Sequence, residues 1–206
     1  MKEENQKDSA LLSILIPTLP ERSAMLERLL RQINSQLENL NAREKVQVCI
    51  LSDNRELTIG AKRNQLMNNA KGKYVAFVDD DDEIGNDYLA SILNAIETEQ
   101  PDVIGMTGIM RWQRTRKMRT DHRFTHSIEH KRWWDRGSGI RTEYFRPPNH
   151  LNPMKREIAV QFPFLEVSFG EDRDWSERIS ASGMLKKEVK IPAVIYYYNF
   201  NPYKNS

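Results

Sequence analysis

Residues 74–83 of the chain read Tyr-Val-Ala-Phe-Val-Asp-Asp-Asp-Asp-Glu. The apolar half of this stretch is rich in β-branched and aromatic side chains and follows Gly72, which is typical of a buried strand. The run Asp79–Asp82 is therefore expected at the carboxyl end of that strand, where ligands bind in open α/β sheets. Carboxylate oxygens suit Mg²⁺ or Mn²⁺, and such an ion would in turn hold a phosphate. The alternative interpretation is a solvated acidic turn.

The segments around this strand alternate between strand-like and helix-like patterns. Strands are expected at residues 11–16, 46–51 and 102–107, and helices at residues 26–40, 58–70 and 86–99. Asn86 or Asp87 is expected to cap the third helix, and Lys71-Gly72 to end the second. The alternation predicts an α/β fold with a mostly parallel central sheet flanked by helices.

The length and composition fit one globular domain that spans residues 1–206. The lone cysteine, Cys49, excludes an intrachain disulfide and a cysteine-rich zinc site. Residues 1–8 are polar and lack the apolar core of a signal peptide. No apolar run approaches the ~20 residues of a membrane span. We therefore expect a cytoplasmic protein without a transmembrane segment.

A basic segment follows the predicted sheet strands. Residues 111–136 carry nine Lys and Arg side chains against three Asp and Glu, and nine minus three leaves a net charge of +6. Four aromatic residues interleave with these charges, namely Trp112, Phe124, Trp133 and Trp134. Such a segment forms either the solvated basic face of a strand pair or loop, or a surface for a polyanion. The spacing of His122, His126 and His130 would align them on a helix, but a zinc site would need further ligands.

The remaining segments are expected to complete the site. Residues 137–165 predict a structured loop across it, anchored by apolar side chains such as Ile140 and Phe164. Glu171 and Asp172 begin an amphipathic helix, where acidic side chains also serve simply to cap the helix and complement its dipole. Residues 189–200 predict a strand with an exposed edge.

Four parts of the chain, in this order, resemble motifs of the family 2 glycosyltransferases: residues 14–18, 51–54, 60–64 with 70–82, and 170–172. The resemblance implies the GT-A fold. In that fold a Rossmann-like nucleotide-binding half, here residues 1–109, is fused to a smaller acceptor-side half, here residues 110–206. The Gln-x-x-Arg-Trp motif of processive members and transmembrane helices are both missing, so a polymerising membrane synthase is not expected. The chain is also short for the family, which leaves little room for a large acceptor domain.

The same resemblance implies a nucleotide-sugar donor, with a UDP-sugar expected, and a Mn²⁺ or Mg²⁺ cofactor. The residues implied to bind the donor are Pro17, Thr18, Asp53, Lys62, Arg63, Asp79 and Asp80. Among them, Asp53 would contact the nucleobase, Arg63 the nucleotide and Asp79 the ribose. Asp81 would hold the metal, with Asp80 or Asp82 as substitutes, because four consecutive aspartates leave the register of the motif open. His150 would be a further metal ligand, or else a loop histidine hydrogen-bonded to the backbone.

For catalysis, the resemblance implies that Asp172 is the general base, with Glu171 beside it. One displacement at the anomeric carbon would invert the sugar's configuration. The acceptor is unidentified, and a polyanion such as modified DNA, a phosphorylated glycan or a lipid-linked phosphate would suit the basic segment. A nucleotidyltransferase is one alternative, although residues 17–22 lack its usual glycine-rich phosphate loop. A non-catalytic module that binds a nucleotide-sugar or a nucleic acid is the other.

Overall fold

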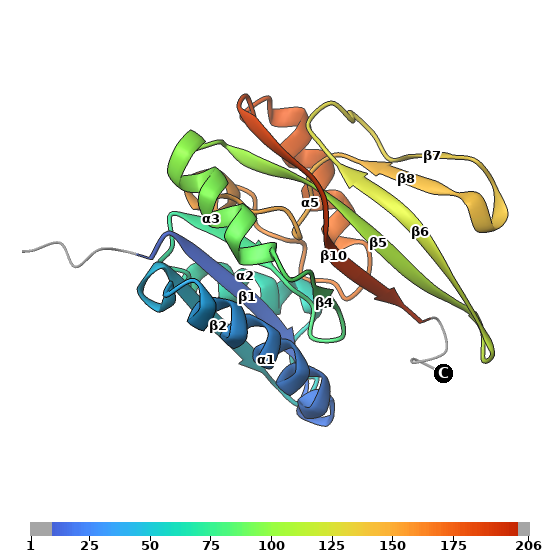
Figure 1. Cartoon of the computed structure of the whole chain (residues 1–206), viewed down its shortest axis with the longest axis horizontal. Helices are drawn as coiled ribbons and strands as arrows, with labels where there is room; N and C mark the ends of the chain where they lie inside the picture. Colours follow the sequence, from blue (N-terminus) through green and yellow to red (C-terminus); the bar gives the residue numbers. More distant parts are fainter. Residues whose placement is uncertain (1–9, 202–206) are drawn as a thin grey trace, which may run out of the picture.

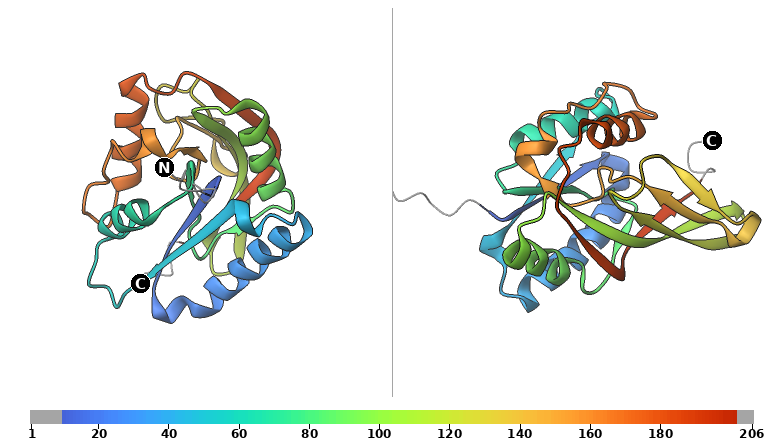
Figure 2. Two further views of the ribbon diagram at one scale, coloured as in Figure 1. Left: turned by 90° about the vertical axis from the view of Figure 1, so that its left-hand side faces the viewer. Right: turned by 90° about the horizontal axis from the view of Figure 1, so that it is seen from above.

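The computed structural model describes residues 10–201, and the polar segment at residues 1–8 lies outside the described residues. Helices cover both faces of a ten-stranded sheet, as the views in Figures 1 and 2 show. The strands are β1 (Leu12–Thr18), β2 (Val46–Ser52), β3 (Tyr74–Phe77), β4 (Glu83–Ile84), β5 (Val103–Thr115), β6 (Met118–His126), β7 (Trp134–Arg136), β8 (Glu143–Arg146), β9 (Met154–Lys155) and β10 (Glu188–Phe200). The helices are α1 (Ser23–Asn39), α2 (Ile59–Asn69), α3 (Tyr88–Glu99), α4 (Arg156–Ala159) and α5 (Glu171–Ser182), with short 3₁₀ turns at Pro20–Arg22, Arg43–Lys45 and Gly139–Arg141. Within the described residues, no helix is long and apolar enough to cross a membrane.

The central strands of the sheet run in one direction. The strand order is β2-β1-β3-β9-β5-β6-β8-β7, with β10 on β5 and β4 on β10. β1 is parallel to β2 and β3, and β10 is parallel to β5. β3 and β5 also share this direction, because each is antiparallel to the short β9 that lies between them. The predicted α/β fold with a mostly parallel central sheet is confirmed.

The first strand extends beyond the expected residues 11–16 and includes a proline. Pro17 and Thr18 continue the pairing of β1 with β2, opposite Leu51 and Ser52. The carbonyl oxygen of Leu15 accepts a hydrogen bond from the Val78 amide, so the backbone N–H and C=O groups of Leu15 face β3. Pro17, two residues later, faces the same side but lies beyond the paired part of β3. Its missing N–H therefore interrupts no ladder, which is why the strand tolerates it.

The histidines of the basic segment are not aligned on a helix. His122 and His126 lie on β6, which forms a long antiparallel hairpin with β5, so this part of the segment is the strand pair that one interpretation expected. A spacing of four residues also places side chains on one face of a strand, so the histidine pattern fits either structure. The strand predicted at 189–200 is β10, which pairs with β5 along most of its length. Among the described strands its other edge pairs only with β4, at Tyr196 and Tyr197, so the expected exposed edge is covered in part.

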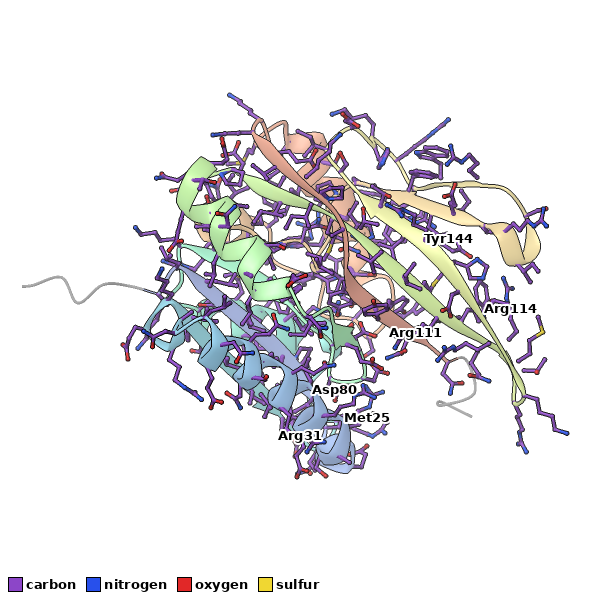
Figure 3. All side chains as sticks on the ribbon, viewed as in Figure 1. Met25, Arg31, Asp80, Arg111, Arg114 and Tyr144 are labelled. Carbon is purple, nitrogen blue, oxygen red and sulfur yellow. The ribbon has the colours of Figure 1, made fainter. Side chains whose placement is uncertain are left out.

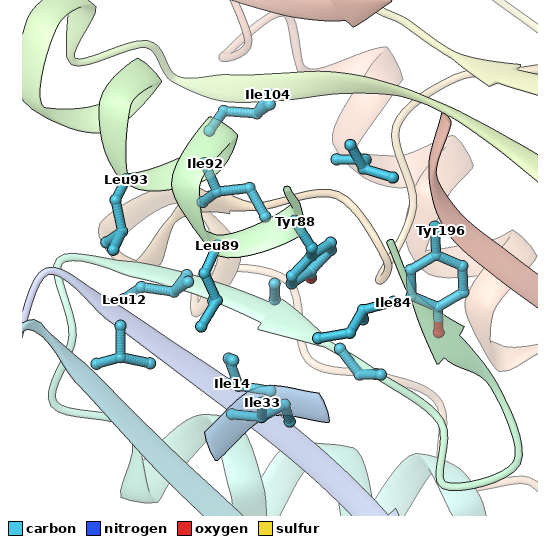
Figure 4. Close-up of a cluster of buried hydrophobic side chains, with 14 of the residues drawn as sticks. Leu12, Ile14, Ile33, Ile84, Tyr88, Leu89, Ile92, Leu93, Ile104 and Tyr196 are labelled. Atoms are coloured by element: carbon cyan, nitrogen blue, oxygen red, sulfur yellow. The ribbon is translucent and has the colours of Figure 1, made fainter. Parts of the chain in front are cut away.

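Hydrophobic side chains form one core on each face of the sheet. Leu12, Ile14 and Ile16 of β1 point into the core with α1 and α3, of which Figure 4 shows the central part. Leu15 points the other way, into a core with α2, α4 and α5 that includes Trp175. Successive side chains of β1 thus enter opposite cores, and the strand is buried on both faces. The ends of the strands remain as the place for the polar side chains of a site.

A side chain from α1 caps α3 in place of the residues expected to do so. Asp87 lies at the N-cap position, but its side chain makes no capping hydrogen bond. The buried Gln36 accepts from the Leu89 amide at 2.9 Å and donates to the Gly85 carbonyl at 2.9 Å. It satisfies one of the amides that a helix start leaves unpaired, and it ties α1 to α3.

Gly72 is required by a close approach of two backbone segments and not by a helix end. The C-cap of α2 is Ala70, in an extended conformation. A Cβ atom on Gly72 would lie 2.5 Å from the Ser13 amide nitrogen in β1. The Gly72 amide also donates to the Ser13 hydroxyl at 2.8 Å. The glycine thus lets the start of β3 pack directly on β1.

The substitution Gly72→Ala is expected to lower the free energy of unfolding by about 1–3 kcal/mol, as overpacking against fixed backbone does. Chemical denaturation would measure it. Lys73→Ala, which truncates the exposed neighbouring side chain, is the control and should change stability by less than ~0.5 kcal/mol. Equal stabilities for the wild type and Gly72→Ala would contradict the close approach.

Candidate active site

A cleft of about 910 Å³ lies at the carboxyl ends of β1 and β3 and extends to β8 and the start of α5. Figure 3 marks two of its lining residues, Asp80 after β3 and Tyr144 on β8. Ten of the eleven predicted site residues line it: Pro17, Thr18, Lys62, Arg63, Asp79, Asp80, Asp81, His150, Glu171 and Asp172. The predicted site residues therefore lie together in one cleft. They do so because most of them follow a strand or begin a helix at one edge of the sheet.

Asp53 is the predicted residue that does not line the cleft. It follows β2, and its buried carboxylate forms an ion pair with the buried Lys62 of α2. Asp53 also accepts from the Leu57 amide at 2.8 Å, while Lys62 donates to the Thr18 carbonyl at 2.9 Å. The hydrogen bonds from Lys62 and Leu57 lower the pKa of Asp53. The pair thus joins the ends of β1 and β2 behind the cleft wall.

Two of the four consecutive aspartates, Asp80 and Asp82, are buried. Asp80 accepts from the Thr18 hydroxyl at 2.7 Å and from Arg22 at 2.9 Å. Asp82 accepts from the Tyr196 hydroxyl at 2.8 Å and from the Asn199 amide at 2.7 Å. Burial raises the pKa of Asp80, and burial together with the charges of Asp79 and Asp81 raises the pKa of Asp82 well above its usual value. Both side chains are buried, so Asp79 and Asp81 are the aspartates with partly exposed side chains at the cleft.

The backbone of the aspartate turn is held from two distant elements. The Asp81 carbonyl accepts from Arg28 of α1 at 2.9 Å and from the Asn199 side chain of β10 at 2.7 Å. Arg28 also donates to the Asp82 carbonyl at 3.1 Å. Sequence reasoning missed Arg22, Arg28 and Asn199, because nothing in their local pattern marks them. Their roles come only from the tertiary contact.

Arg63 of α2 connects four segments of the site. Its buried guanidinium pairs with Glu171 at the start of α5 and with Asp79 after β3, the latter at 3.2 Å. Its Nη2 also lies 3.1 Å from Nε2 of His150. Burial alone would raise the pKa of Asp79, but the opposing charge of Arg63 and contact with His150 outweigh it and lower that pKa. The carboxylate of Asp79 is therefore held in its charged form.

His150 lies between the two acidic clusters. Its Nε2 is 3.7 Å from an oxygen of Asp79, and its Nδ1 is 3.9 Å from an oxygen of Asp172. Nδ1 is buried and, within residues 10–201, has no hydrogen-bond partner. The backbone contact at this residue uses its main-chain oxygen, which accepts from the Phe77 amide at 3.0 Å. The expected alternative of a ring hydrogen-bonded to the backbone is thus not what the structure has.

The two acidic residues at the start of α5 point to different places. Gly170 precedes them with a φ of 82°, which lets the chain turn into the helix. Glu171 is buried against Arg63, whereas the Asp172 side chain is 30% exposed at the cleft. The Asp172 carboxylate accepts from the Arg173 amide at 2.8 Å. Asp172 is therefore the carboxylate of this pair that a bound hydroxyl group can reach.

The acidic residues of the cleft fit a divalent ion that is completed by a ligand. Among residues 10–201, no group of three or more His, Cys, Asp and Glu side chains is arranged as a metal site. Mg²⁺ and Mn²⁺ in nucleotide-dependent enzymes, however, are commonly bound by one or two carboxylates together with substrate phosphates. Asp79 and Asp81 offer such hard oxygen atoms beside Arg63, Lys62 and Arg22, which suit a diphosphate.

Comparison with known proteins identifies the family. The model of glycosyl transferase family 2 matches residues 41–166, and the chain belongs to this family. Crystal structures of S. aureus TarS 1-349 are similar in fold. The complex with UDP-GlcNAc has a TM-score of 0.59 at 14% identity and covers 92% of this chain and 58% of that one. The complex with UDP has a TM-score of 0.60 at 16% identity and covers 93% and 61%.

The predicted GT-A fold is confirmed by this similarity. At these identities the likeness to TarS concerns the fold, and the chain spans about three fifths of the length of TarS 1-349. No curated protein sequence matches the chain.

Proposed function

We propose that the protein transfers a sugar from a nucleotide-sugar, with a UDP-sugar as the donor, to a hydroxyl group of an acceptor. The observation that carries this proposal is the meeting of the aspartate turn, Arg63, His150 and Asp172 in one cleft. The complexes of TarS with UDP-GlcNAc and UDP support the choice of a UDP-sugar. In this proposal residues 1–109 bind the donor, and residues 110–206 supply most of the acceptor side.

The donor would lie along the aspartate side of the cleft. Asp79 would contact the ribose, while Thr18, Lys62 and Arg63 would lie near the base and the phosphates. Asp53 does not itself line the cleft, so it would contribute to binding of the nucleobase indirectly, by holding Lys62 in an ion pair. Asp81 would hold a Mn²⁺ or Mg²⁺ ion, with His150 as a further ligand. Such an ion, when bound, neutralises the charge that develops on the diphosphate as it leaves.

Asp172 would be the general base and Glu171 its support. As the acceptor oxygen attacks the anomeric carbon, its proton passes to the Asp172 carboxylate, and the bond from that carbon to the diphosphate breaks. A single displacement of this kind inverts the configuration at the anomeric carbon. Glu171 fixes the start of α5 through Arg63, which keeps the Asp172 carboxylate at the cleft.

Thermal melting with nucleotides tests the donor site. At a hundred times its Kd, UDP with Mn²⁺ should add ~2.7 kcal/mol to the free energy of unfolding, or roughly 5–10 °C in Tm. EDTA and the substitution Asp81→Asn should each remove most of this shift. Asp87→Asn removes the same charge from an exposed residue nearby and should preserve it. If neither UDP nor the other nucleoside diphosphates shift the Tm, the proposal fails.

A further inference from the structure

Two arginines and two aromatic residues form the wall of the cleft at β8 and the start of α5. Tyr144 and Arg146 come from β8, Trp133 from the segment before β7, and Arg173 from the first turn of α5. All four line the cleft. Arg173 directly follows the proposed base, and its amide donates to that carboxylate. This wall therefore adjoins the place where the acceptor hydroxyl must lie.

Arg146 is held in a fixed orientation. Its Nη1 donates to the carbonyls of Trp134 and Phe145 at 2.7 and 2.9 Å and lies 2.6 Å from the Asp135 carboxylate. Its side chain is only 12% exposed. These contacts all use one of the three guanidinium nitrogens. The charge is thus positioned in advance, with N–H groups that a ligand in the cleft can still use.

The aromatic rings of this wall are covered by cations. The Arg146 guanidinium lies 4.7 Å from the ring centre of Trp133 and 5.1 Å from that of Tyr144. The Arg173 guanidinium lies 5.7 Å from the same Trp133 ring. A nucleobase would need these ring faces for stacking. Guanidinium groups in contact with the rings instead present N–H donors, which bind anionic oxygens in a planar, bidentate manner.

We propose that Trp133, Arg146 and Arg173 form an acceptor subsite for a polyhydroxylated molecule that carries an anionic oxyacid group close to the hydroxyl that is glycosylated. The inference rests on the proposed function, which supplies the hydroxyl acceptor. Arg146 and Arg173 bind the anion, and Trp133 keeps both guanidinium groups in position. The hydroxyl group then lies at Asp172, one residue from Arg173, so binding the anion orients the nucleophile.

Three sugars that differ only at C6 test this subsite. Ligand-observed NMR with glucose, glucuronate and glucose 6-phosphate, in the presence of UDP and Mn²⁺ at low salt, compares no charge, a carboxylate and a phosphate. We expect the better of the two charged sugars to bind at least tenfold more tightly than glucose, and this preference to weaken with added salt. Which charged sugar binds better identifies the oxyacid. Equal binding of all three sugars would overturn the proposal.

Variants locate the effect in the cleft. Arg173→Met should remove most of the preference. It is not expected to unfold the chain, because the side chain is exposed and its contacts among the described residues are an ion pair with Glu177 on the same helix and the Trp133 ring. Arg146→Met should do the same, although it also loses contacts with the backbone of β8. Arg116→Ala at the exposed β5–β6 turn removes the same charge outside the cleft and should keep the preference. Equal loss in all three variants would show only non-specific attraction and would overturn the subsite.

The nucleotide-induced Tm shift is recorded on the same samples. A shift without any preference among the sugars would reject the acceptor subsite alone. The absence of a shift would reject the proposed function, on which the subsite depends. The two failures are therefore distinguishable.

Discussion

The substitution Asp172→Asn is expected to lower the rate of sugar transfer by roughly 10²- to 10⁴-fold, the usual contribution of a positioned general base. Asparagine keeps the shape of the side chain but cannot take a proton from the acceptor hydroxyl. Because Asp172 is not among the residues proposed to hold the donor or the metal, the Tm shift with UDP and Mn²⁺ should change little. The rate of transfer would be measured as release of UDP in the presence of an acceptor. The nucleotide-induced Tm shift, measured on the same variant, would separate a loss of catalysis from a loss of donor binding.

Asp174→Asn is the matched control for this prediction. Asp174 also lies in the first turn of α5, so its loss changes the helix start by the same charge. Its carboxylate pairs with Arg178 on the helix and does not line the cleft. Transfer should remain close to the wild-type rate in this variant. Full transfer activity in Asp172→Asn would show that another group takes the proton. Nucleotide binding without any transfer by the wild type would instead favour a binding module.

The substitution Arg63→Met is expected to lower the free energy of unfolding by about 3–5 kcal/mol, the typical cost of removing one partner from a buried ion pair. It leaves the carboxylates of Glu171 and Asp79 without their shared cation. The Tm should fall by roughly 6–20 °C for a chain of this size. Transfer should also be lost, since the start of α5 and the aspartate turn are no longer joined.

Two comparisons make this second prediction specific. Arg55→Met removes an exposed pair with Glu21 and should cost less than ~1 kcal/mol. The double variant Arg63→Met with Glu171→Gln should be less destabilised than the sum of the two single variants, because Gln leaves no unpaired charge at position 171. Additive effects in this cycle would mean that Arg63 and Glu171 do not depend on each other for stability.

The sequence predicted the sheet edge and its acidic residues well, for a local reason. A buried strand that ends in charged residues, as β3 does, marks the edge by itself. The partners of those residues were not predictable in this way. Arg28 and Asn199 belong to an ordinary amphipathic helix and to a strand, and only the fold brings them to the Asp81 carbonyl.

The acceptor side shows the same limit. The basic and aromatic composition of residues 111–136 was visible, but not which of its side chains enter the cleft. Trp133 does so together with Arg146, which lies outside that segment. The insertion of β9 between β3 and β5, and the pairing of β10 on both sides, are long-range events. Periodicity within a window of residues carries no information about them.

The contacts of Asp82 have a consequence for the order in which the protein matures. The aspartate turn is completed by Tyr196 and Asn199, which follow it by 114 and 117 residues in the chain. Closing so long a loop is entropically costly, and such contacts form late in folding. A ribosome-bound chain that has released β1 to β5 thus has the acidic edge but not its final geometry. Competence to bind a donor is therefore acquired only when the last strand has joined the sheet.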